Sequence, residues 1–518
     1  MAQTADRTYE AALRHLDSIQ SNRHVTSLFT APAPSSSPSS SPSSKPTAQD
    51  LNAQAIPEML AWLSRAGLTQ TDLAARLRCV HVAGTKGKGS VCAYVTSILL
   101  AQPSARAGRV GTYTSPHLVS VRERIQLDGR PISRALFARY FFEVWDALTA
   151  SARAEAAAAS GRPVSEEELR GPATKPFYFR FLTILALHAF LREGVRSAVV
   201  ECGIGGEYDS TNVLPAGAVT AAVVARLGVD HVGMLGATLP EIAWHKAGVC
   251  KPGRKCFTLR AGDEDAMRVL RQRAAEKKAL LVEVDDEGWS GVQVGGGVLG
   301  GSFQKGNQAL ALLAASEHLR VLAADPDSPQ LGAGEEPLEV LGSRFAEGLR
   351  RARLRGRCET LEDGDITWFI DGAHTADSLE ETGIWFAQKL TARPQTRTVL
   401  LFNQQERDVA RLLVSLHAGI KRQPEPRSFD CAVFTRNDLQ RAAAGEPERD
   451  LTVQRAAADA VQNGSSVTKT IVTDNVAEAV EKIRTMQRDD GGKLAVLATG
   501  SLHLVGALLR TLEPDGEI

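Results

Sequence analysis

Continuous apolar runs alternate with longer helical segments from about residue 79 onward. The apolar runs lie at 79–84, 109–115, 197–206 and 218–228, and an apolar helix is expected at 179–194, where Gly194 ends it. Uninterrupted apolar strands between helices are typical of a parallel sheet covered on both faces. The pattern therefore predicts an α/β fold with a parallel-rich central sheet.

Further helices are expected outside these strands. One is predicted at 8–20, and a second at 56–66 with Pro57 near its first turn. The segment 239–250 predicts the start of a third helix, with Pro240 in its first turn.

A second α/β series follows residues 322–340, which are rich in Pro, Gly and acidic residues and predict a linker. Its five strand-like runs are 366–374, 398–408, 429–435, 468–474 and 493–509. This series predicts a smaller Rossmann-like domain. We therefore expect an N-terminal domain at 1–335 and a C-terminal domain at 336–518.

Three segments interrupt the two series. Residues 31–48 are a Pro/Ser-rich, low-complexity stretch that cannot bury apolar surface, and they predict a mobile insertion. Residues 151–174 are rich in Ala, Glu and Gly and predict a surface insertion. Residues 437–469 are polar and predict a loop and a helix.

Composition narrows the function classes. The chain of 518 residues is 43% hydrophobic and 23% charged, which is ordinary for a globular enzyme of two to four domains. Basic and acidic residues balance at 60 each. Bulk electrostatics therefore gives no reason to expect nucleic acid or a membrane surface as a partner.

Cysteine usage and the N-terminus bear on the compartment. Seven cysteines are scattered without a C-x-x-C pair, which favours reduced thiols over a disulfide framework or a zinc site. We expect no membrane span, since no apolar run reaches about 18 residues. The N-terminal stretch lacks an apolar signal core and carries Asp6 and Glu10. These features favour the cytoplasm, with a mitochondrial leader from an upstream start as an open alternative.

A glycine-rich stretch at 84–90 predicts a phosphate-binding loop between a strand and a helix. Its sequence, GTKGKGS, differs from G-x-x-x-x-G-K-[ST] because Gly89 separates Lys88 from Ser90. The glycines let backbone N–H groups surround phosphate oxygens, and the helix adds its positive N-terminal end. The alternative is a glycine-rich turn without a ligand.

Polar residues follow two other strands. Glu201 ends an apolar strand, where ligands bind in parallel sheets, and a buried carboxylate there calls for a cation or hydrogen bonds. Capping of a helix is the alternative for Glu201. Asp230 and His231 follow the next strand, although a lone histidine is often structural. Lys246, within an apolar helix, is either a surface residue or a desolvated, reactive one.

The loop at 114–117 holds Thr, Ser, Pro and His after a strand, and Arg122 and Arg124 follow it. On a strand, two arginines spaced by two would share a face suited to carboxylates. A solvated strand face is the alternative.

In the second series, Asp371 ends an apolar strand and lies fourteen residues after Arg357. His374 opens the next turn or helix. An aspartate at a strand end is a ligand position in a Rossmann-like sheet. Capping of the next helix is the alternative for Asp371.

Together these motifs resemble the folylpolyglutamate synthases of the eukaryotic type, within the Mur-ligase superfamily. The resemblance covers nearly the whole chain apart from the three insertions. The matching segments appear in family order and are 7–22, GTKGKGS (84–90), YTSPHLVSVRERI (113–125), ECGIGGEYDSTN (201–212), LGVDHVGMLG (227–236), IAWHKAG (242–248), IDGAH (370–374) and TGSLHLVG (499–506).

The resemblance implies an ATP-dependent amide ligase. Such an enzyme phosphorylates the γ-carboxylate of a reduced folate, and the amine of L-glutamate then attacks the acyl phosphate, releasing ADP and phosphate. It implies Mg²⁺, with a monovalent cation such as K⁺ as a further candidate, and a monomer. Its partners would be ATP, reduced folates with one or more glutamates, and L-glutamate.

The resemblance also assigns residues to roles. The ATP-binding set is Gly84, Thr85, Gly87, Lys88, Gly89, Ser90, Asn307, Arg357 and Asp371. The metal set is Ser115, Glu201 and His231. The catalytic set is Lys246, which is carbamylated in related enzymes, with His374 and Asp371. The substrate-binding set is Thr114, Pro116, His117, Arg122, Arg124, Phe177, Phe179 and Asp209.

Two other interpretations stay open. A nucleotide-binding switch protein would share the phosphate loop, although the guanine-specific N-K-x-D motif is absent from the sequence. A dihydrofolate synthase or another Mur-type ligase would share most of the motifs, and dihydropteroate as acceptor separates it from a folylpolyglutamate synthase.

Overall fold

The computed structural model describes residues 6–20, 48–158, 164–284, 304–324, 338–405, 408–423, 426–441, 448–464 and 469–513. Nearly all of the predicted insertion at 31–48 and most of the predicted linker at 322–340 lie outside these residues. The chain divides into two compact units. The first takes in residues up to Pro116 and resumes at Arg122, continuing to Ala352 apart from a short stretch ending at Lys305. The second contains His117–Val121 and the chain from Arg353 onward.

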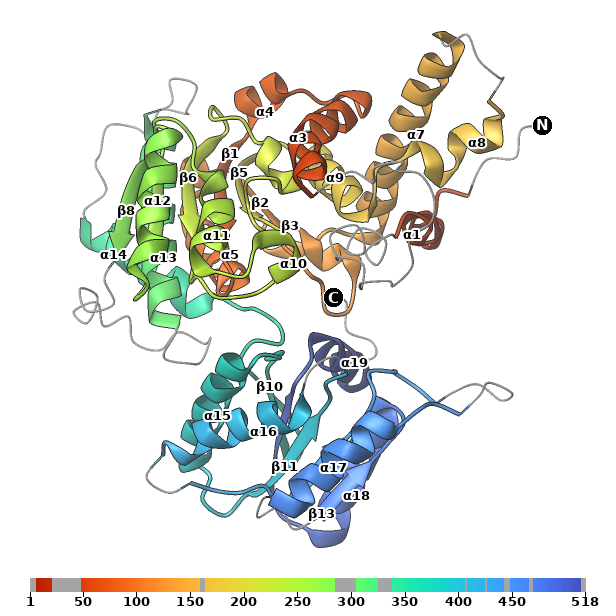
Figure 1. Ribbon diagram of the computed structural model, residues 1–518, viewed down its shortest axis with the longest axis vertical. Helices are drawn as coiled ribbons and strands as arrows, with labels where there is room; N and C mark the ends of the chain where they lie inside the picture. The colour runs from red at the N-terminus through yellow and green to blue at the C-terminus, as the bar shows by residue number, and fades with distance from the viewer. Residues whose placement is uncertain are drawn as a thin grey trace, which may run out of the picture. The chain divides into compact units, whose positions relative to one another are not determined.

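The first unit is built on a mostly parallel sheet with the strand order β4-β3-β2-β5-β1-β6-β7-β8 among the described residues (Figure 1). The pairs β2–β3 and β3–β4 are antiparallel, and the other pairs of described strands in this sheet are parallel. Its strands are β1 (Arg78–Ala83), β2 (Arg109–Tyr113), β3 (Ile125–Leu127), β4 (Arg130–Pro131), β5 (Val195–Glu201), β6 (Val219–Val224), β7 (Lys255–Leu259) and β8 (Leu280–Val284).

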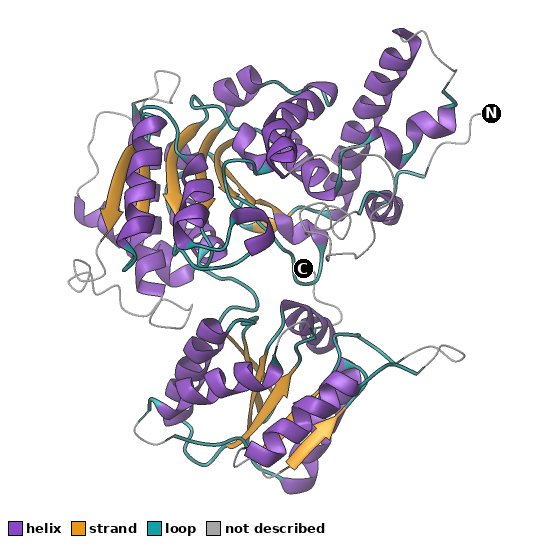
Figure 2. Ribbon diagram, viewed as in Figure 1, coloured by secondary structure: helices purple, strands orange, loops and turns teal. Residues whose placement is uncertain are grey.

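Helices cover this sheet on both sides (Figure 2). The α-helices are α1 (Tyr9–Ser18), α3 (Ala48–Arg65), α4 (Gln70–Arg76), α5 (Lys88–Leu100), α6 (Ser104–Ala107), α7 (Arg134–Ala158), α8 (Glu166–Arg170), α9 (Tyr178–Arg192), α10 (Val232–Leu235), α11 (Leu239–Lys246), α12 (Glu264–Glu276), α13 (Gln304–Ala323) and α14 (Leu338–Arg351). Single 3₁₀ turns are η1 (Val121–Arg124), η2 (Pro172–Thr174), η3 (Ser210–Val213) and η4 (Ala247–Val249).

The central strands are buried on both faces, which explains their uninterrupted apolar sequences. All six residues of β6 are buried, and so are five of six in β1. Strand β1 pairs with β5 so that Val82 lies opposite Glu201. The carboxylate predicted from the sequence therefore stands at the carboxyl end of the sheet, beside the end of β1.

The second unit has a six-stranded sheet with the order β13-β12-β11-β14-β10-β9 among its described strands. Only β9 is antiparallel. The strands are β9 (Glu359–Asp363), β10 (Ile366–Ile370), β11 (Arg397–Phe402), β12 (Cys431–Phe434), β13 (Lys469–Val472) and β14 (Leu494–Thr499). The helices are α15 (Ala376–Thr391), α16 (Val409–Lys421), α17 (Thr452–Gly464), α18 (Val476–Asp490) and α19 (Leu502–Leu512).

Alternation along β10 divides the core of this unit in two. Trp368 and Ile370 pack into the cluster that contains α18 and α19, whereas Phe369 packs into the cluster that contains α15, α16 and α17. Both faces are therefore covered, as the sequence predicts for a Rossmann-like sheet.

One expectation about helices is wrong. Helix α3 begins at Ala48, so Pro57 lies inside it and not in its first turn. Good helix-forming residues upstream and the buried Met59 and Leu63 downstream outweigh the hydrogen bond that proline removes. Residues 151–158, in the segment expected to be a surface insertion, form the last turns of α7 and are exposed or half-buried.

Two of the strands that the pattern missed, β8 and β9, share a physical feature. Strand β9 alternates between half-buried and exposed positions, and β8 at the sheet edge is fully buried only at Val284. Strands with one wetted side lack the continuous apolar run used to find the central ones.

Candidate active site

The predicted phosphate-binding loop lies between β1 and α5 and is shaped by two glycines with positive φ. Gly84 has φ 147°, and Gly87, the N-cap of α5, has φ 89°. A Cβ at Gly84 would lie 2.8 Å from the Cβ of Ala225, so the loop passes close to the end of β6. Both features require glycine.

Two side chains hold this loop in place. The hydroxyl of Thr85 donates to the carbonyl of Gly228 at 2.9 Å and accepts from the Gly228 N–H at 3.1 Å. The Lys88 ammonium lies 2.9 Å from the carbonyl of Gly84. The loop is thus tied to the segment after β6, which leads directly to Asp230 and His231.

Asn307 lies against the loop from α13. It is 3% exposed, and a Cβ at Gly87 would lie only 2.3 Å from its Oδ1. Ser90, in the first turn of α5, is also buried. The structure therefore brings Asn307, which is far away in sequence, to the loop it is predicted to serve.

Two of the three predicted metal ligands are joined by a hydrogen bond. The backbone N–H of Ser115 donates to Oε2 of Glu201 at 3.0 Å. Glu201 is 4% exposed, and it ends β5 without capping a helix, which removes that alternative. A serine hydroxyl and a carboxylate are the hard oxygen donors that suit Mg²⁺, so this pair fits the implied ion.

His231, the third predicted ligand, has an exposed side chain and a left-handed backbone with φ 51°. Its Nε2 lies 4.0 Å from Oδ2 of Asp230. Within the described ranges, no group of three or more His, Cys, Asp and Glu side chains is arranged to hold a metal. The predicted set, in which a serine hydroxyl joins one carboxylate and one imidazole, does not depend on such a group.

Lys246 is the buried, desolvated lysine and not the surface one. It is 2% exposed at the end of α11. Burial, and after it the positive charge of Lys88, lowers its pKa to about 7, although Cys202, Asp230 and Asp209 oppose this shift. The charge of Lys88 therefore acts on a desolvated amine, and a lysine with a lowered pKa in such a setting is a candidate reactive group.

The glycine-rich loop after β5 packs on the end of α11. A Cβ at Gly206 would lie 2.7 Å from the carbonyl oxygen of His245 and 2.9 Å from that of Lys246. The N–H of Glu207 donates to the same His245 carbonyl at 2.7 Å. The glycines therefore allow the loop to approach the backbone that carries Lys246.

Asp209, a predicted substrate contact, accepts hydrogen bonds from its own loop. Its Oδ2 accepts from the N–H groups of Gly203 and Ile204, at 2.9 and 3.0 Å. Its Oδ1 accepts from the N–H and the hydroxyl of Thr211, at 2.9 and 2.5 Å. Burial raises the pKa of Asp209, and these hydrogen bonds oppose that shift.

The prediction that Arg122 and Arg124 share one face of a strand is wrong. Arg122 and Arg124 lie in the 3₁₀ turn η1, where residues two apart do not share a face. Arg122 donates to the carbonyl of Ile132, and the guanidinium of Arg124 lies 5.5 Å from the centre of the Tyr178 ring. The chain turns here before β3 begins, and the N–H of Thr114 donates to the Arg124 carbonyl across the turn.

The predicted substrate-binding aromatics differ in exposure. Phe177, the N-cap residue of α9, is 45% exposed. Phe179 is half-buried, stacks on Tyr113 with ring centres 6.0 Å apart, and contacts Gly203 closely. Thr114 and Ser115 lie in the first unit with Pro116, whereas His117 belongs to the second.

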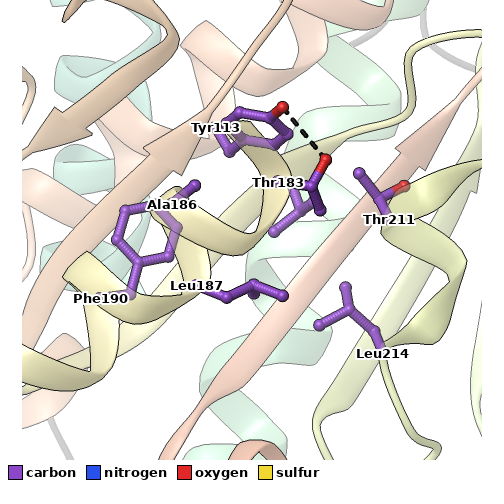
Figure 3. Close-up of a pocket in the computed structure, with 8 residues that line it drawn as sticks. Tyr113, Thr183, Ala186, Leu187, Phe190, Thr211 and Leu214 are labelled. Atoms are coloured by element: carbon purple, nitrogen blue, oxygen red, sulfur yellow. Dashed lines mark hydrogen bonds between the residues drawn. The ribbon is translucent and has the colours of Figure 1, made fainter. Parts of the chain in front are cut away.

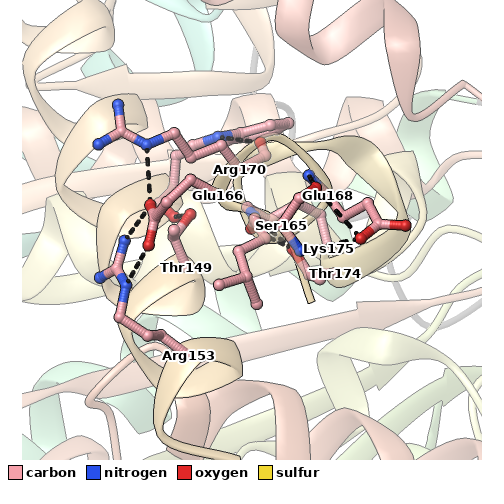
Figure 4. Close-up of polar contacts among 10 residues, drawn as sticks. Thr149, Arg153, Ser165, Glu166, Glu168, Arg170, Thr174 and Lys175 are labelled. Carbon is pink, nitrogen blue, oxygen red and sulfur yellow. Dashed lines mark hydrogen bonds and ion pairs between the residues drawn. The ribbon is translucent and has the colours of Figure 1, made fainter. Parts of the chain in front are cut away.

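The segment before Phe177 is anchored by a buried lysine that the sequence did not single out. Lys175 donates to Oγ1 of Thr174 at 2.7 Å and to the carbonyl of Leu169 at 3.1 Å (Figure 4). Its ammonium also lies 4.8 Å from the centre of the Trp145 ring on α7. Burial lowers its pKa to about 8. Residues 164–174 are thus fixed to α7 by this lysine.

Three predicted residues of the second unit gather at the end of β10. Oδ2 of Asp371 accepts from the N–H of Cys358 at 2.8 Å, which holds the residue after Arg357. A Cβ at Gly372 would lie 3.4 Å from Nη1 of Arg357, and Nδ1 of His374 lies 2.9 Å from the Gly372 carbonyl. Thr375, not Asp371, caps α15, which removes the capping alternative.

Sequence reasoning missed a buried polar group behind the site. His81 interrupts the apolar β1 and contacts Thr211, and Lys251 lies 2.9 Å from Oδ1 of Asn212. Thr211 also lines a small gap with Tyr113, Thr183 and Leu214 that is too tight to admit water (Figure 3). A histidine inside a V-H-V strand is the signal that could have found this group.

Comparisons with known proteins bear on the family. No family model matches the chain. The folylpolyglutamate synthase of Saccharomyces cerevisiae is 35% identical over 516 residues, which cover 97% of this chain and 86% of the yeast protein. Among the described residues, no helix is long and apolar enough to cross a membrane.

Solved structures share the fold. The Mycobacterium tuberculosis folylpolyglutamate synthase complexed with ADP has a TM-score of 0.65 at 23% identity, covering 97% of this chain and all of that one. The Thermotoga maritima folylpolyglutamate synthase has a TM-score of 0.62 at 21% identity, covering 89% of this chain and 93% of that one. The likeness to the yeast protein, over nearly the whole chain, establishes the relationship: this chain belongs to the folylpolyglutamate synthase family.

Proposed function

We propose that this chain is an ATP-dependent ligase that adds L-glutamate to the γ-carboxyl of the glutamyl tail of a reduced folate. Family membership over 97% of the chain supports this proposal. The observation that carries it is the carboxyl edge of the first sheet. There a glycine-rich loop, two neighbouring lysines and the Ser115–Glu201 pair lie together.

The chemistry follows from the charges at this edge. A carboxylate is a poor electrophile, and phosphorylation by ATP gives it a good leaving group. The substrate carboxylate and the γ-phosphate repel one another, so their approach needs positive charge in a dry site. Lys88, at the start of α5, supplies that charge, and the loop N–H groups orient the phosphates.

The residues proposed to hold Mg²⁺ are Ser115, Glu201 and His231. The ion would neutralise phosphate charge when bound. Glu201 and Ser115 are preorganised for this by their mutual hydrogen bond. Separately, we expect activity to depend on K⁺, and assays with and without K⁺ measure this dependence.

Lys246 is proposed to react with CO₂. A lysine whose pKa is lowered to about 7 is partly neutral at physiological pH, and only the neutral amine is nucleophilic. Its lone pair would form an N–C bond to CO₂ and release one proton, leaving a carbamate anion. Intact-mass analysis in bicarbonate buffer would show the added mass, and a free amine in active enzyme would contradict the proposal.

In the second unit, we propose Arg357 and Asp371 as nucleotide contacts and His374 as a catalytic residue. Their proximity at the end of β10 supports this. Asp371 also accepts from the N–H of Ala373 and the hydroxyl of Thr382. Its carboxylate therefore shapes the turn that presents His374.

Phe177, Phe179, Asp209 and the loop at 114–117 are proposed acceptor contacts. The close packing of Phe179 on Gly203 supports this grouping, because it joins α9 to the loop after β5.

The test is a product analysis. The protein is incubated with ATP, Mg²⁺, L-glutamate and tetrahydrofolate, and the folate products are resolved by mass spectrometry. We expect a ladder of products that differ by one glutamyl residue, with stoichiometric ADP. ATP hydrolysis without any folate of higher mass would refute the proposal. Dihydropteroate in place of tetrahydrofolate detects dihydrofolate synthase activity, the competing assignment.

Two further expectations concern the protein itself. We propose a monomer, which light scattering after size-exclusion chromatography measures. We propose action in the cytoplasm and in mitochondria, which imaging of a fluorescent fusion in cells checks.

A further inference from the structure

A buried chain of hydrogen bonds runs from the middle of β1 to the loop after β5. His81 is fully buried, and its Nε2 lies 2.8 Å from Oγ1 of Thr211. Oγ1 of Thr211 lies 2.5 Å from Oδ1 of Asp209. Oδ2 of Asp209 accepts the backbone N–H groups of Gly203 and Ile204. Three side chains thus connect the sheet interior to two loop amides.

The direction of each hydrogen bond follows from what the groups can donate. An ionised Asp209 only accepts, so the single hydroxyl proton of Thr211 points to it. Sγ of Cys202 lies 3.1 Å from Nε2 of His81 and 3.4 Å from Oγ1 of Thr211, but a thiol sulfur is a weak acceptor and competes little with the carboxylate for the hydroxyl proton. Thr211 therefore accepts from His81, which places the imidazole proton on Nε2. Nδ1 of His81 is left as the unprotonated nitrogen, and it is the ring nitrogen that has no partner among the described residues. Burial lowers the pKa of His81 to about 3, in keeping with a neutral ring.

The loop amides at the end of this chain lie where the proposed acceptor contacts meet. Gly203 packs against the ring of Phe179, and three residues later Gly206 packs against the backbone of Lys246. A small shift of the loop would therefore move both neighbours. Thr211 also lines the tight gap shown in Figure 3, so its side chain has little room to move.

We propose that His81 and Thr211 are positioning residues. Through Asp209, they hold residues 203–212 in the shape that receives the acceptor of the proposed ligase. This inference rests on the proposed function for its kinetic readout, but its structural content stands apart from it.

A second buried histidine supplies an internal control. His318 contacts Thr220 through Nδ1 at 2.7 Å and Ser197 through Nε2 at 2.9 Å. Like His81 it is fully buried, and burial lowers its pKa to about 3. Its partners lie near the beginnings of β5 and β6, away from the loop. Removing the Thr220 hydroxyl therefore costs a buried hydrogen bond without touching residues 203–212.

The experiment compares Thr211→Val, Thr211→Ser and Thr220→Val in the full-length protein. Valine keeps the shape of threonine and removes the hydroxyl, whereas serine keeps the hydroxyl. We expect Thr211→Val to raise the KM for tetrahydrofolate at least about tenfold while the KM for ATP stays within about twofold. Thr211→Ser should restore the wild-type KM, and Thr220→Val should leave both KM values unchanged.

Hydrogen exchange gives a readout that needs no activity. We expect the peptide that covers 203–212 to exchange several-fold faster in Thr211→Val than in wild type, and Thr220→Val to leave it unchanged. If Thr211→Val is insoluble, Thr211→Cys takes its place. Because a thiol is a weaker donor than a hydroxyl, the cysteine variant should exchange faster than Thr211→Ser in this peptide.

Equal behaviour of the valine and serine variants would overturn the proposal. So would a Thr211→Val variant that only lowers the melting temperature, as Thr220→Val should. If the wild-type protein adds no glutamate at all, the proposed function fails. The exchange comparison then still decides whether the hydrogen-bond chain positions the loop.

Discussion

The two ends of the strands in the large sheet differ in how their polar groups are paired. We call the amino ends of the strands the amino edge and the carboxyl ends the carboxyl edge. Near the amino ends of the strands, Lys255 pairs with Glu317 at 2.9 Å, and His318 bonds two hydroxyls. At the carboxyl ends, burial and the charge of Lys88 disfavour the protonated form of Lys246, and glycines allow loops to approach one another closely. The amino edge is satisfied by its own residues. At the carboxyl edge, Lys88 and burial perturb Lys246, and a strongly perturbed group of this kind marks a candidate functional site.

The largest expected effect is the loss of a carboxylate at the carboxyl edge. We expect Glu201→Ala to lower kcat at least about 10³-fold, because this edge loses the proposed metal-binding oxygens. Glutamate incorporation at saturating Mg²⁺ measures the effect, and circular dichroism checks the fold. The matched control is Glu317→Ala at the amino edge, which should leave kcat within about twofold. Near-normal activity of Glu201→Ala would show that a carboxylate at the carboxyl edge matters no more for kcat than one at the amino edge.

The second largest effect is expected from an added methyl group in the predicted phosphate-binding loop. We expect Gly87→Ala to raise the KM for ATP by roughly 10- to 100-fold, because its φ of 89° is strained for alanine and its Cβ would meet Asn307. Gly253→Ala is the control, since Gly253 has φ 70° but no heavy atom lies within 4 Å of the position that a Cβ would take. It introduces the strain without the collision and should keep a normal KM. An unchanged KM in both variants would show that the loop tolerates the methyl group.

A stability measurement addresses the buried lysine. Because the pKa of Lys246 is lowered to about 7 in the folded protein, the unfolded chain holds more protons between that pH and its ordinary pKa. The folding penalty is therefore complete below pH 7 and disappears as the pH rises toward the unfolded pKa. We expect Lys246→Met to stabilise the protein by a few kcal/mol at pH 6.5, in bicarbonate-free buffer, while abolishing turnover.

Urea unfolding at pH 6.5 and at pH 9.5 measures this prediction. The gain should be clearly smaller at the higher pH. Lys255→Met, which removes the partner of Glu317, should give no gain at either pH. A gain for Lys246→Met that is equal at both pH values would mean that the amine charge is not its cause.

The smallest expected effect belongs to the amino edge. Thr220→Val removes the hydroxyl that donates to the carbonyl of Cys79 and contacts His318. We expect a loss of about 1–2 kcal/mol in the free energy of unfolding, typical of a buried hydrogen bond, with unchanged kcat/KM. Chemical denaturation measures the first and the ligase assay the second. A loss of kcat/KM here would show that the two edges are energetically coupled.

The sequence predicted the central strands and the loops that follow them because their signals are local. A continuous apolar run identifies a strand buried on both faces, and a carboxylate or glycine cluster at its end marks the ligand-binding edge. Edge strands such as β8 and β9 escaped because one side of each is wetted. The spacing of Arg122 and Arg124 misled because the same spacing means different faces in a strand and in a 3₁₀ turn.

The roles of the candidate residues remain predictions, but the structure changes the physical setting of several. Asp209 was singled out as a substrate contact, and it is also the anchor of its own loop. Lys175 carried no motif that marked it, since a buried lysine is recognisable only once its neighbours are known, whereas His81 was marked only by its place inside an apolar strand.

By itself, the sequence determined the α/β class, the phosphate loop with its unusual Gly89, and the polar residues that end β5 and β10. These follow from short-range patterns of hydrophobicity and backbone freedom. Only the tertiary structure decided that Asn307 meets Gly87, that Lys246 is desolvated beside Lys88, and that Thr211 links His81 to Asp209. Desolvation and hydrogen-bond direction depend on every neighbour in space, and a linear pattern does not contain that information.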